Sequence, residues 1–164
     1  MISIAEVRRL LSYDAGTGKL IRLVTVSNAK AGSEAGYVRP DGYRQIRAHG
    51  SQYFAHRLAF VCAYGRWPVG DIDHINGDRS DNRIENLREV THAENQKNQK
   101  RHSTNTSGAV GVYWHKATSK WKAQIKADGV QKYLGLFDNK QDAIEARKAA
   151  EIELGFHENH GRAL

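Results

Sequence analysis

One stretch of the chain, residues 71–95, gathers side chains that could carry out chemistry together. Asp73 and His74 follow a short apolar run, and Asn95 lies beyond a polar loop. A neutral imidazole, with an unperturbed pKa of about 6.5, can accept a proton from water near neutral pH. Carboxylate and amide oxygens are hard ligands that suit Mg²⁺ or Mn²⁺ and leave positions for water and phosphate. This stretch could therefore bring an imidazole and two metal-ligating oxygens together.

Local signals predict the elements that position these side chains. Residues 70–74 and 87–90 are short and apolar, which indicates two strands joined by the polar loop 76–86. Residues 91–94, Thr-His-Ala-Glu, fit a capping box, so a helix should run over about 91–100. The result is a compact unit of strand, loop, strand and helix.

The predicted helix could lie across the two strands so that Asn95 faces Asp73. The strand imposes a condition, because adjacent strand residues point to opposite faces. Asp73 and His74 can therefore share a site only if the strand ends or bulges there. The Ile-Asn-Gly that follows favours such an ending.

The order and spacing of these residues resemble the HNH nucleases of phage and group I intron homing endonucleases, which carry a ββα-metal arrangement. The matching strings are residues 73–77 (DHING), 81–87 (DNRIENL) and 91–95 (THAEN). The resemblance implies that His74 is the general base and that Asn86 braces the loop. It also implies that Asp73 and Asn95 bind the metal. The last position is Asn in place of His, a version common in the subfamily, although a neutral amide is the weaker ligand.

The resemblance also implies an activity, the hydrolysis of DNA phosphodiester bonds to a 5′-phosphate and a 3′-hydroxyl with one Mg²⁺ or Mn²⁺ per active site. The metal would neutralise the scissile phosphate and stabilise the departing oxygen. The resemblance implies a homing-type endonuclease, and one active site per chain predicts that it nicks one strand of double-stranded DNA unless the protein dimerises or acts twice. The alternative is a sequence-specific DNA-binding regulator with an inactive HNH fold. A third hypothesis is an RNA-binding or structural phage protein.

Other roles compete at several of these positions. Residues 71–77 resemble the start of a calcium-binding EF-hand loop, but an isoleucine stands at the third ligand position. His74 could be a hydrogen-bonded loop histidine and Asn86 a turn residue, but the complete ordered set favours catalysis. The HNH resemblance extends upstream to residues 56–58. There His56 either braces the site or is a buried, hydrogen-bonded histidine.

Composition limits the partners and the compartment. The chain has 164 residues, a formal net charge of +7 and a sequence pI of about 9.6, which indicate a polyanionic partner. The lone Cys62 excludes a disulfide framework and a cysteine-rich zinc site. There is no long apolar run and no signal-peptide core. We therefore expect a soluble, cytoplasmic protein, a monomer with no membrane partner or small-molecule cofactor, and the HNH resemblance implies a phage-infected bacterial host.

The N-terminal part is predicted to lead into the motif. A capping box at residues 3–6 predicts a packing helix, and a glycine-rich turn predicts a hairpin between residues 11–13 and 19–23. A β-meander over residues 36–54 and a helix over residues 55–65 follow. The meander carries three arginines that could contact phosphate, although a solvated strand face is favoured for them: Arg39, Arg44 and Arg47.

Basic residues gather beyond the motif. Residues 95–127 contain seven Lys or Arg and no Asp or Glu, so this stretch accounts for the whole net charge. Residues 101–107 are polar, lack apolar periodicity and are predicted to form a linker. Three strand-like segments follow, at residues 111–115, 120–127 and 130–137. Asp138 or Asn139 then caps a helix that should run to about Leu154.

This second module resembles the AP2 DNA-binding domain, which reads the major groove with the exposed face of a three-stranded sheet. The matching patterns are Gly-Val-x-Trp from Gly111, Lys-Trp-x-Ala-x-Ile from Lys120 and Leu-Gly-x-Phe from Leu134. In the second strand Trp121, Ala123 and Ile125 alternate with polar residues.

We expect the polar face of this sheet to meet DNA, with lysines on phosphate and Gln124 as a possible base reader. The predicted DNA-binding residues are Lys116, Lys120, Lys122, Gln124, Lys126 and Lys132. Trp114 and Trp121 are expected in the core.

These features together predict an α+β protein of two modules. Residues 1–100 would form the nuclease domain, in which a β-meander and a helix lead into a ββα-metal core at about 68–100. Residues 101–107 would be the linker, and residues 108–164 an AP2-like domain of a three-stranded antiparallel sheet plus a helix. Such a linker would raise the effective concentration of the nuclease at its target.

Overall fold

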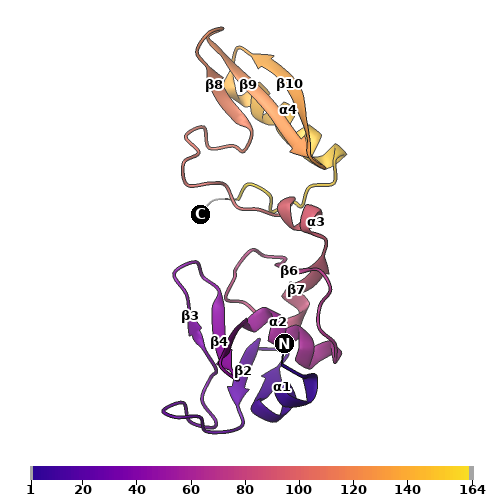
Figure 1. Cartoon of the computed structure of the whole chain (residues 1–164). Helices are drawn as coiled ribbons and strands as arrows, with labels where there is room; N and C mark the ends of the chain where they lie inside the picture. The colour runs from indigo at the N-terminus through magenta and orange to yellow at the C-terminus, as the bar shows by residue number, and fades with distance from the viewer. Residues whose placement is uncertain (1, 163–164) are drawn as a thin grey trace. The chain divides into compact units, whose positions relative to one another are not determined.

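The computed structural model describes residues 2–162, and its contacts divide the chain into two compact units (Figure 1). The first unit ends at Thr91 and the second begins at His92. No helix in the described part of the chain is long and apolar enough to cross a membrane.

The first unit contains two α-helices, one 3-10 turn and seven short strands. In chain order they are α1 (Ile4–Leu10), β1 (Leu11–Asp14), β2 (Lys19–Arg22), β3 (Tyr37–Val38), β4 (Arg44–Ala48), β5 (Ser51–Phe54), α2 (Ala55–Tyr64), β6 (Asp71–His74), η1 (Ile84–Asn86) and β7 (Leu87–Val90). The strands form three antiparallel sheets, namely β1–β2, β3–β4–β5 and β6–β7. The predicted hairpin, meander and motif strands are all present.

Local signals set the ends of the helices in this unit. Ser3 caps α1 by accepting a hydrogen bond from the main-chain N–H of Glu6. Gly65 ends α2 with a φ of 65°, a left-handed conformation that glycine adopts without a steric penalty. The core of the unit forms around α2, where Leu58, Ala59 and Val61 are fully buried.

The second unit contains a short helix, a three-stranded sheet and a long helix. They are α3 (His92–Gln96), β8 (Val112–His115), β9 (Lys120–Ala127), β10 (Val130–Phe137) and α4 (Lys140–Glu153). The sheet is antiparallel in the order β10–β9–β8, and α4 lies across one of its faces (Figure 1). Asn139 caps α4 by accepting a hydrogen bond from Asp142 N, as predicted. Val112, Ala123 and Ala143 form the core between sheet and helix.

The helix predicted over residues 91–100 is shorter than expected, because α3 ends at Gln96. Lys97 and Asn98 make bonds of the i to i+3 type, which tighten the last turn. The Arg162 guanidinium then binds both the main-chain and the side-chain oxygen of Asn98, at 2.8 and 2.9 Å. This distant contact draws the chain out of the helical path.

The segment predicted as a linker is tied to its neighbours in the second unit. The main-chain N–H of Arg101 donates to Arg162 O, and its guanidinium donates to Gly108 O. The contact division falls before this segment, between Thr91 and His92. The assignment of a nuclease domain, a linker and a DNA-binding domain stays a prediction.

Candidate functional site

The predicted acid–imidazole pair lies at the end of β6. This strand pairs with β7 in a regular antiparallel register, with Asp73 opposite Arg88 and His74 opposite Leu87. The pleat directs Asp73 and His74 to opposite faces of the two-stranded sheet. The strand ends at His74, which is one of the two conditions under which both side chains can contribute to one site.

On one face, Arg88 binds Asp73. Its Nε and Nη2 lie 3.0 and 2.8 Å from Oδ2 of Asp73, whose side chain is only 8% exposed. The guanidinium thus places a positive charge and two hydrogen-bond donors beside a nearly buried carboxylate. Sequence reasoning gave Arg88 no role, although its place directly across the strand pair could have suggested one.

On the other face, His74 is buried in a cluster of rings. The ring of His56 meets it edge to face at 5.1 Å between centroids, and Tyr43 lies at 5.9 Å. Burial lowers the pKa of His74 below its ordinary value, while a hydrogen bond to Asn82 and the charge of Asp73 act to raise it. His74 is therefore neutral near pH 7, the form in which an imidazole can accept a proton.

His56 forms part of the same cluster. Its ring stacks on Phe54 with a centroid separation of 5.3 Å and an interplanar angle of 10°. Burial lowers the pKa of His56 to about 3, and the neighbouring His74 and Arg57 act in the same direction. His56 thus packs as a neutral ring against the candidate base.

The loop between β6 and β7 is closed by Asn86. Its Oδ1 accepts from the main-chain N–H of Asn76 at 2.9 Å, and its Nδ2 donates to the main-chain O of Asp81 at 2.8 Å. Its own main-chain O accepts from Ile75 N. One buried side chain thus joins the beginning of the loop to its end. This geometry is what a loop brace requires, and the catalytic importance of Asn86 stays a prediction.

Turns inside the loop hold it in one conformation. Asp78 accepts from the N–H and the hydroxyl of Ser80. Asp81 binds Arg83 through both carboxylate oxygens, and this contact lowers the pKa of Asp81 to about 2. Short side chains that bond the local backbone stabilise such turns.

Two arginines lie over the rings that surround His74. The Arg79 guanidinium sits 4.8 Å above the ring of Tyr43 and donates to the main-chain O of Asp41. The Arg39 guanidinium sits 5.5 Å above Phe54, within the range of cation–π contacts. Sequence reasoning favoured a solvated face for Arg39 over a phosphate contact, and it overlooked Arg79. Arg79 thus lies over a ring that contacts the candidate base, while Arg39 also pairs with Asp41 at 3.0 Å.

The predicted metal ligands offer suitable donor chemistry. Asp73 supplies a carboxylate whose charge is already offset by one cation, which a divalent ion could replace. Asn95 lies in α3, in the second unit, and is half-buried. Within residues 2–162 no group of three or more His, Cys, Asp or Glu could hold a metal. The joint role of Asp73 and Asn95 stays a prediction.

In the second unit, β9 separates its side chains into two faces as predicted. Ala123 and Ile125 are buried against α4, at 0% and 1% exposure. On the opposite face Gln124 accepts from the hydroxyl of Tyr113 and from Nε2 of Gln131. Lys122 lies over the rings of two tyrosines, Tyr113 and Tyr133, at 5.8 and 5.6 Å. These tyrosines and Gln131 were missed, because cross-strand register decides which residues share a face.

Not all of the predicted DNA-binding residues lie on this face. Lys120 and Lys126 do, while Lys116 is exposed in the turn after β8. Lys132 does not, because it pairs across the strands with buried Ile125 and approaches Glu153 of α4 at 3.5 Å.

The expectation that both tryptophans belong to the core is wrong for Trp114. It is 46% exposed and meets Trp121 edge to face at the rim of the core.

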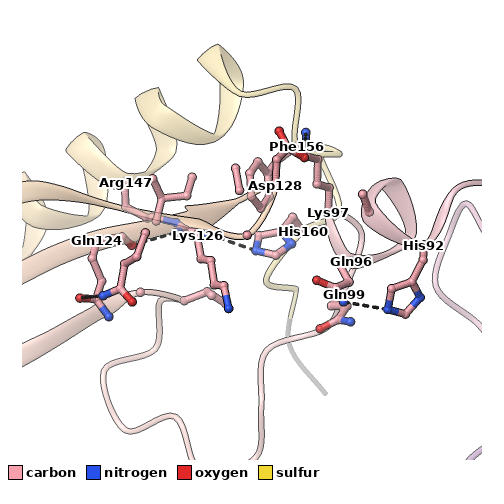
Figure 2. A pocket seen from close by; sticks show the side chains of 17 residues that line it. His92, Gln96, Lys97, Gln99, Gln124, Lys126, Asp128, Arg147, Phe156 and His160 are labelled. Atoms are coloured by element: carbon pink, nitrogen blue, oxygen red, sulfur yellow. Dashed lines mark hydrogen bonds and ion pairs between the residues drawn. The ribbon is translucent and has the colours of Figure 1, made fainter.

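The second unit also contains a hollow of about 730 Å³ (Figure 2). Two of the cations that line it are bound internally: Arg147 donates to the main-chain O of Gln124 and pairs with Glu151, each at 2.8 Å. Lys97 donates to the main-chain O of Leu154. These cations stabilise the unit itself.

Comparison with known proteins bears on the first unit and on α3. Residues 53–97 match the family model described as HNH endonuclease. A stretch of 77 residues is 36% identical to Protein 3.8 of Escherichia phage T7, and covers 46% of this chain and 64% of that protein. The chain thus spans less than two thirds of that relative's length. No solved structure matches the chain. Residues 53–97, an HNH endonuclease domain, include all four predicted site residues of the motif.

Proposed function

We propose that this protein is a metal-dependent DNA endonuclease of the homing type, which nicks one strand of duplex DNA. The observation that carries the proposal is the buried, neutral His74 at the end of β6, inside the HNH match. Asn86 supports it by closing the loop that follows the candidate base.

In this proposal His74 takes a proton from the attacking water. Its neutral ring can act near pH 7 because burial disfavours the charged form. Asn86 holds the loop that carries the surrounding groups. Arg79 and Arg39 lie over the neighbouring rings, where their positive charge would attract the phosphates on either side of the scissile bond.

The metal in this proposal is Mg²⁺ or Mn²⁺, held by Asp73 and Asn95. When bound, it would supply Lewis-acid stabilisation of the charge that develops on the phosphate and the leaving oxygen. Asp73 would exchange its contact with Arg88 for the ion.

The second unit would hold the DNA. Its sheet presents Lys120, Lys122, Gln124 and Lys126 on the face away from α4, which supports phosphate and base contacts there. The AP2-like role is part of this proposal, as is the action of the protein inside an infected bacterial cell.

The first test is the conversion of supercoiled plasmid to open circle in Mg²⁺ or Mn²⁺. The plasmid should carry the DNA that flanks the gene, because a rare-cutting enzyme can leave an arbitrary sequence intact. His74→Ala should lower the nicking rate by about 10²–10⁴, the usual contribution of a general base. His102→Ala, at an exposed histidine of the second unit, serves as the matched control and should nick like the wild type.

The competing function is a DNA-binding regulator with an inactive HNH fold. The basic face of the second unit favours this function, because lysines can bind DNA without a metal. A wild-type protein that shifts the plasmid on a gel equally in EDTA and Mg²⁺, but leaves it uncut, would replace the nuclease proposal with this one.

A further inference from the structure

Asn82 lies beside the candidate base and is among the most deeply buried polar residues of the first unit, with 2% exposure. Its side-chain Oδ1 is 3.3 Å from Nε2 of His74. A buried amide has a donor end and an acceptor end, and both need partners. The partner of the donor end therefore determines which end faces His74.

That second partner is the main-chain O of Ser80, which lies 3.1 Å from Nδ2 of Asn82. A carbonyl oxygen can only accept a hydrogen bond, so the NH₂ end of the amide faces Ser80. Oδ1 then faces His74, and it too can only accept. Nε2 of His74 must therefore carry the proton that forms this hydrogen bond.

We propose that Asn82 is a positioning residue that holds the ring of His74 in the tautomer protonated on Nε2, so that Nδ1 is the nitrogen that accepts a proton. The use of Nδ1 in catalysis rests on the proposed nuclease function, whereas the tautomer itself does not. The opposite tautomer would present an N–H at Nδ1, which cannot take a proton from water.

The same hydrogen bond serves the ring after proton transfer. When Nδ1 gains a proton, Nε2–H still donates to Oδ1 of Asn82. A hydrogen bond from a charged donor is roughly twice as strong as a neutral one. Asn82 would thus stabilise the charged ring that forms during the reaction.

The surrounding structure holds Asn82 in place. Its main-chain O accepts from the Tyr13 hydroxyl at 2.8 Å, so the hairpin β1–β2 anchors the backbone at this position. On the other side, the ring of His56 meets His74 edge to face and limits its rotation. Tyr13 therefore holds the backbone of Asn82, the acceptor, and His56 restrains the ring of His74, the donor. Neither residue belongs to the loop between β6 and β7.

The direct test is the tautomer of His74 in the full-length protein, measured by long-range ¹H–¹⁵N NMR correlation. Protonated and unprotonated ring nitrogens have well-separated ¹⁵N shifts, and the His74→Ala spectrum assigns the signals. The measurement is made in EDTA at about pH 8, above the ordinary imidazole pKa of about 6.5. We expect a protonated Nε2. A protonated Nδ1 in the wild type would overturn the proposal.

Three variants test whether Asn82 is the cause. Asn82→Leu removes the acceptor at similar volume and should allow the Nδ1–H tautomer to appear. Asn82→Asp keeps an acceptor at this position and should retain Nε2–H. Tyr13→Phe, the matched control, loosens the backbone of Asn82 but leaves its amide, and should also retain Nε2–H. An unchanged tautomer in a folded Asn82→Leu protein would contradict the role of Asn82.

Cleavage then separates this inference from the proposed function. Asn82→Leu should lower kcat by about 10- to 100-fold with little change in KM, the size of the loss when a hydrogen bond that orients a metal-bound histidine is removed. A wild type that shows Nε2–H but does not cut DNA would support the tautomer and reject the nuclease. A wild type that cuts DNA but carries the proton of His74 on Nδ1 would support the nuclease and reject the proposed tautomer.

Discussion

At the scale of single residues, the two buried histidines of the first unit, His56 and His74, are held neutral by burial. His56 is 7% exposed and His74 is 4% exposed, and their rings are in edge-to-face contact. A charge on either ring would lack water and would repel the other ring if that were also charged. The cluster that shields the candidate base should therefore be sensitive to acid.

We predict that the first unit loses stability as the pH falls. The pKa of His56 is about 3 in the fold and about 6.5 when unfolded, so the unfolded chain binds more protons between these values. The stability is fully present above about pH 6.5 and is lost as the pH falls toward 3, by an amount on the order of 5 kcal/mol. The lowered pKa of His74 acts in the same direction.

The measurement is urea unfolding of the wild type and of His56→Phe at a series of pH values. The variant removes the group that titrates and should show a shallower fall in the free energy of unfolding below about pH 6.5. Equally steep profiles for the two proteins would reject His56 as the source.

At the scale of elements, the N-terminal hairpin supports the loop that carries the candidate site. The Tyr13 hydroxyl binds the main-chain O of Asn82, and Ile84 N donates to the main-chain O of Ala15. The turn of the hairpin packs directly on the loop backbone at Gly18, where φ is 73°. The hairpin β1–β2 therefore helps to hold the β6–β7 loop in place within the first unit.

We predict that Gly18→Ala destabilises the loop. A Cβ at this position would lie 2.5 Å from Arg83 N and 2.6 Å from Asn82 C, so the loop backbone would have to move. The expected cost is about 1–2 kcal/mol for the left-handed conformation plus about 1–3 kcal/mol for overpacking. Denaturant unfolding gives the stability, and the plasmid assay gives the nicking rate, which should fall as well.

Gly50→Ala is the control for this prediction. Gly50 has nearly the same φ, 74°, but a Cβ there meets nothing within 4 Å. It should carry only the conformational cost and leave nicking intact. Equal losses of stability and of nicking rate in the two variants would show that the close contact between Gly18 and the loop backbone contributes nothing to either.

At the scale of the whole molecule, positive charge is concentrated in one part of the chain. The stretch 95–127 accounts for the net charge of +7, and most of it belongs to the second unit's strands and the segment before them. Lysines that contact DNA phosphates release counterions, so such binding weakens with salt. Lysines lie on both faces of the sheet. The effect of losing a phosphate contact can therefore be measured separately from the effect of losing one positive charge.

We predict that Lys126→Ala weakens DNA binding and that Lys132→Ala does not. Both substitutions remove one positive charge, but Lys126 lies on the polar face, whereas Lys132 lies on the side of α4 near Glu153. Fluorescence anisotropy with duplex DNA at several salt concentrations is the measurement. Lys126→Ala should reduce the salt slope by about one, the value of a single phosphate contact. Similar losses for both variants would indicate non-specific charge attraction.

The sequence by itself determined most element boundaries. Ser3, Gly65 and Asn139 mark helix ends because capping is local: Ser3 and Asn139 cap through their side chains, and Gly65 through its left-handed backbone. The motif strands follow from short apolar runs beside a polar loop, and the alternation of β9 predicted its buried face. The order of Asp, His and Asn residues also indicated the HNH endonuclease domain that the family comparison supports.

Only the tertiary structure decided how distant residues meet. Just beyond the end of α3, Asn98 is contacted by Arg162 from 64 residues away. Cross-strand pairing placed Arg88 on Asp73 and turned Lys132 away from the polar face, and the folded hairpin brought Tyr13 to Asn82. Such contacts depend on strand register and on the packing of separate elements. Neither is encoded in the local pattern of residues, because each needs the position of a partner far along the chain.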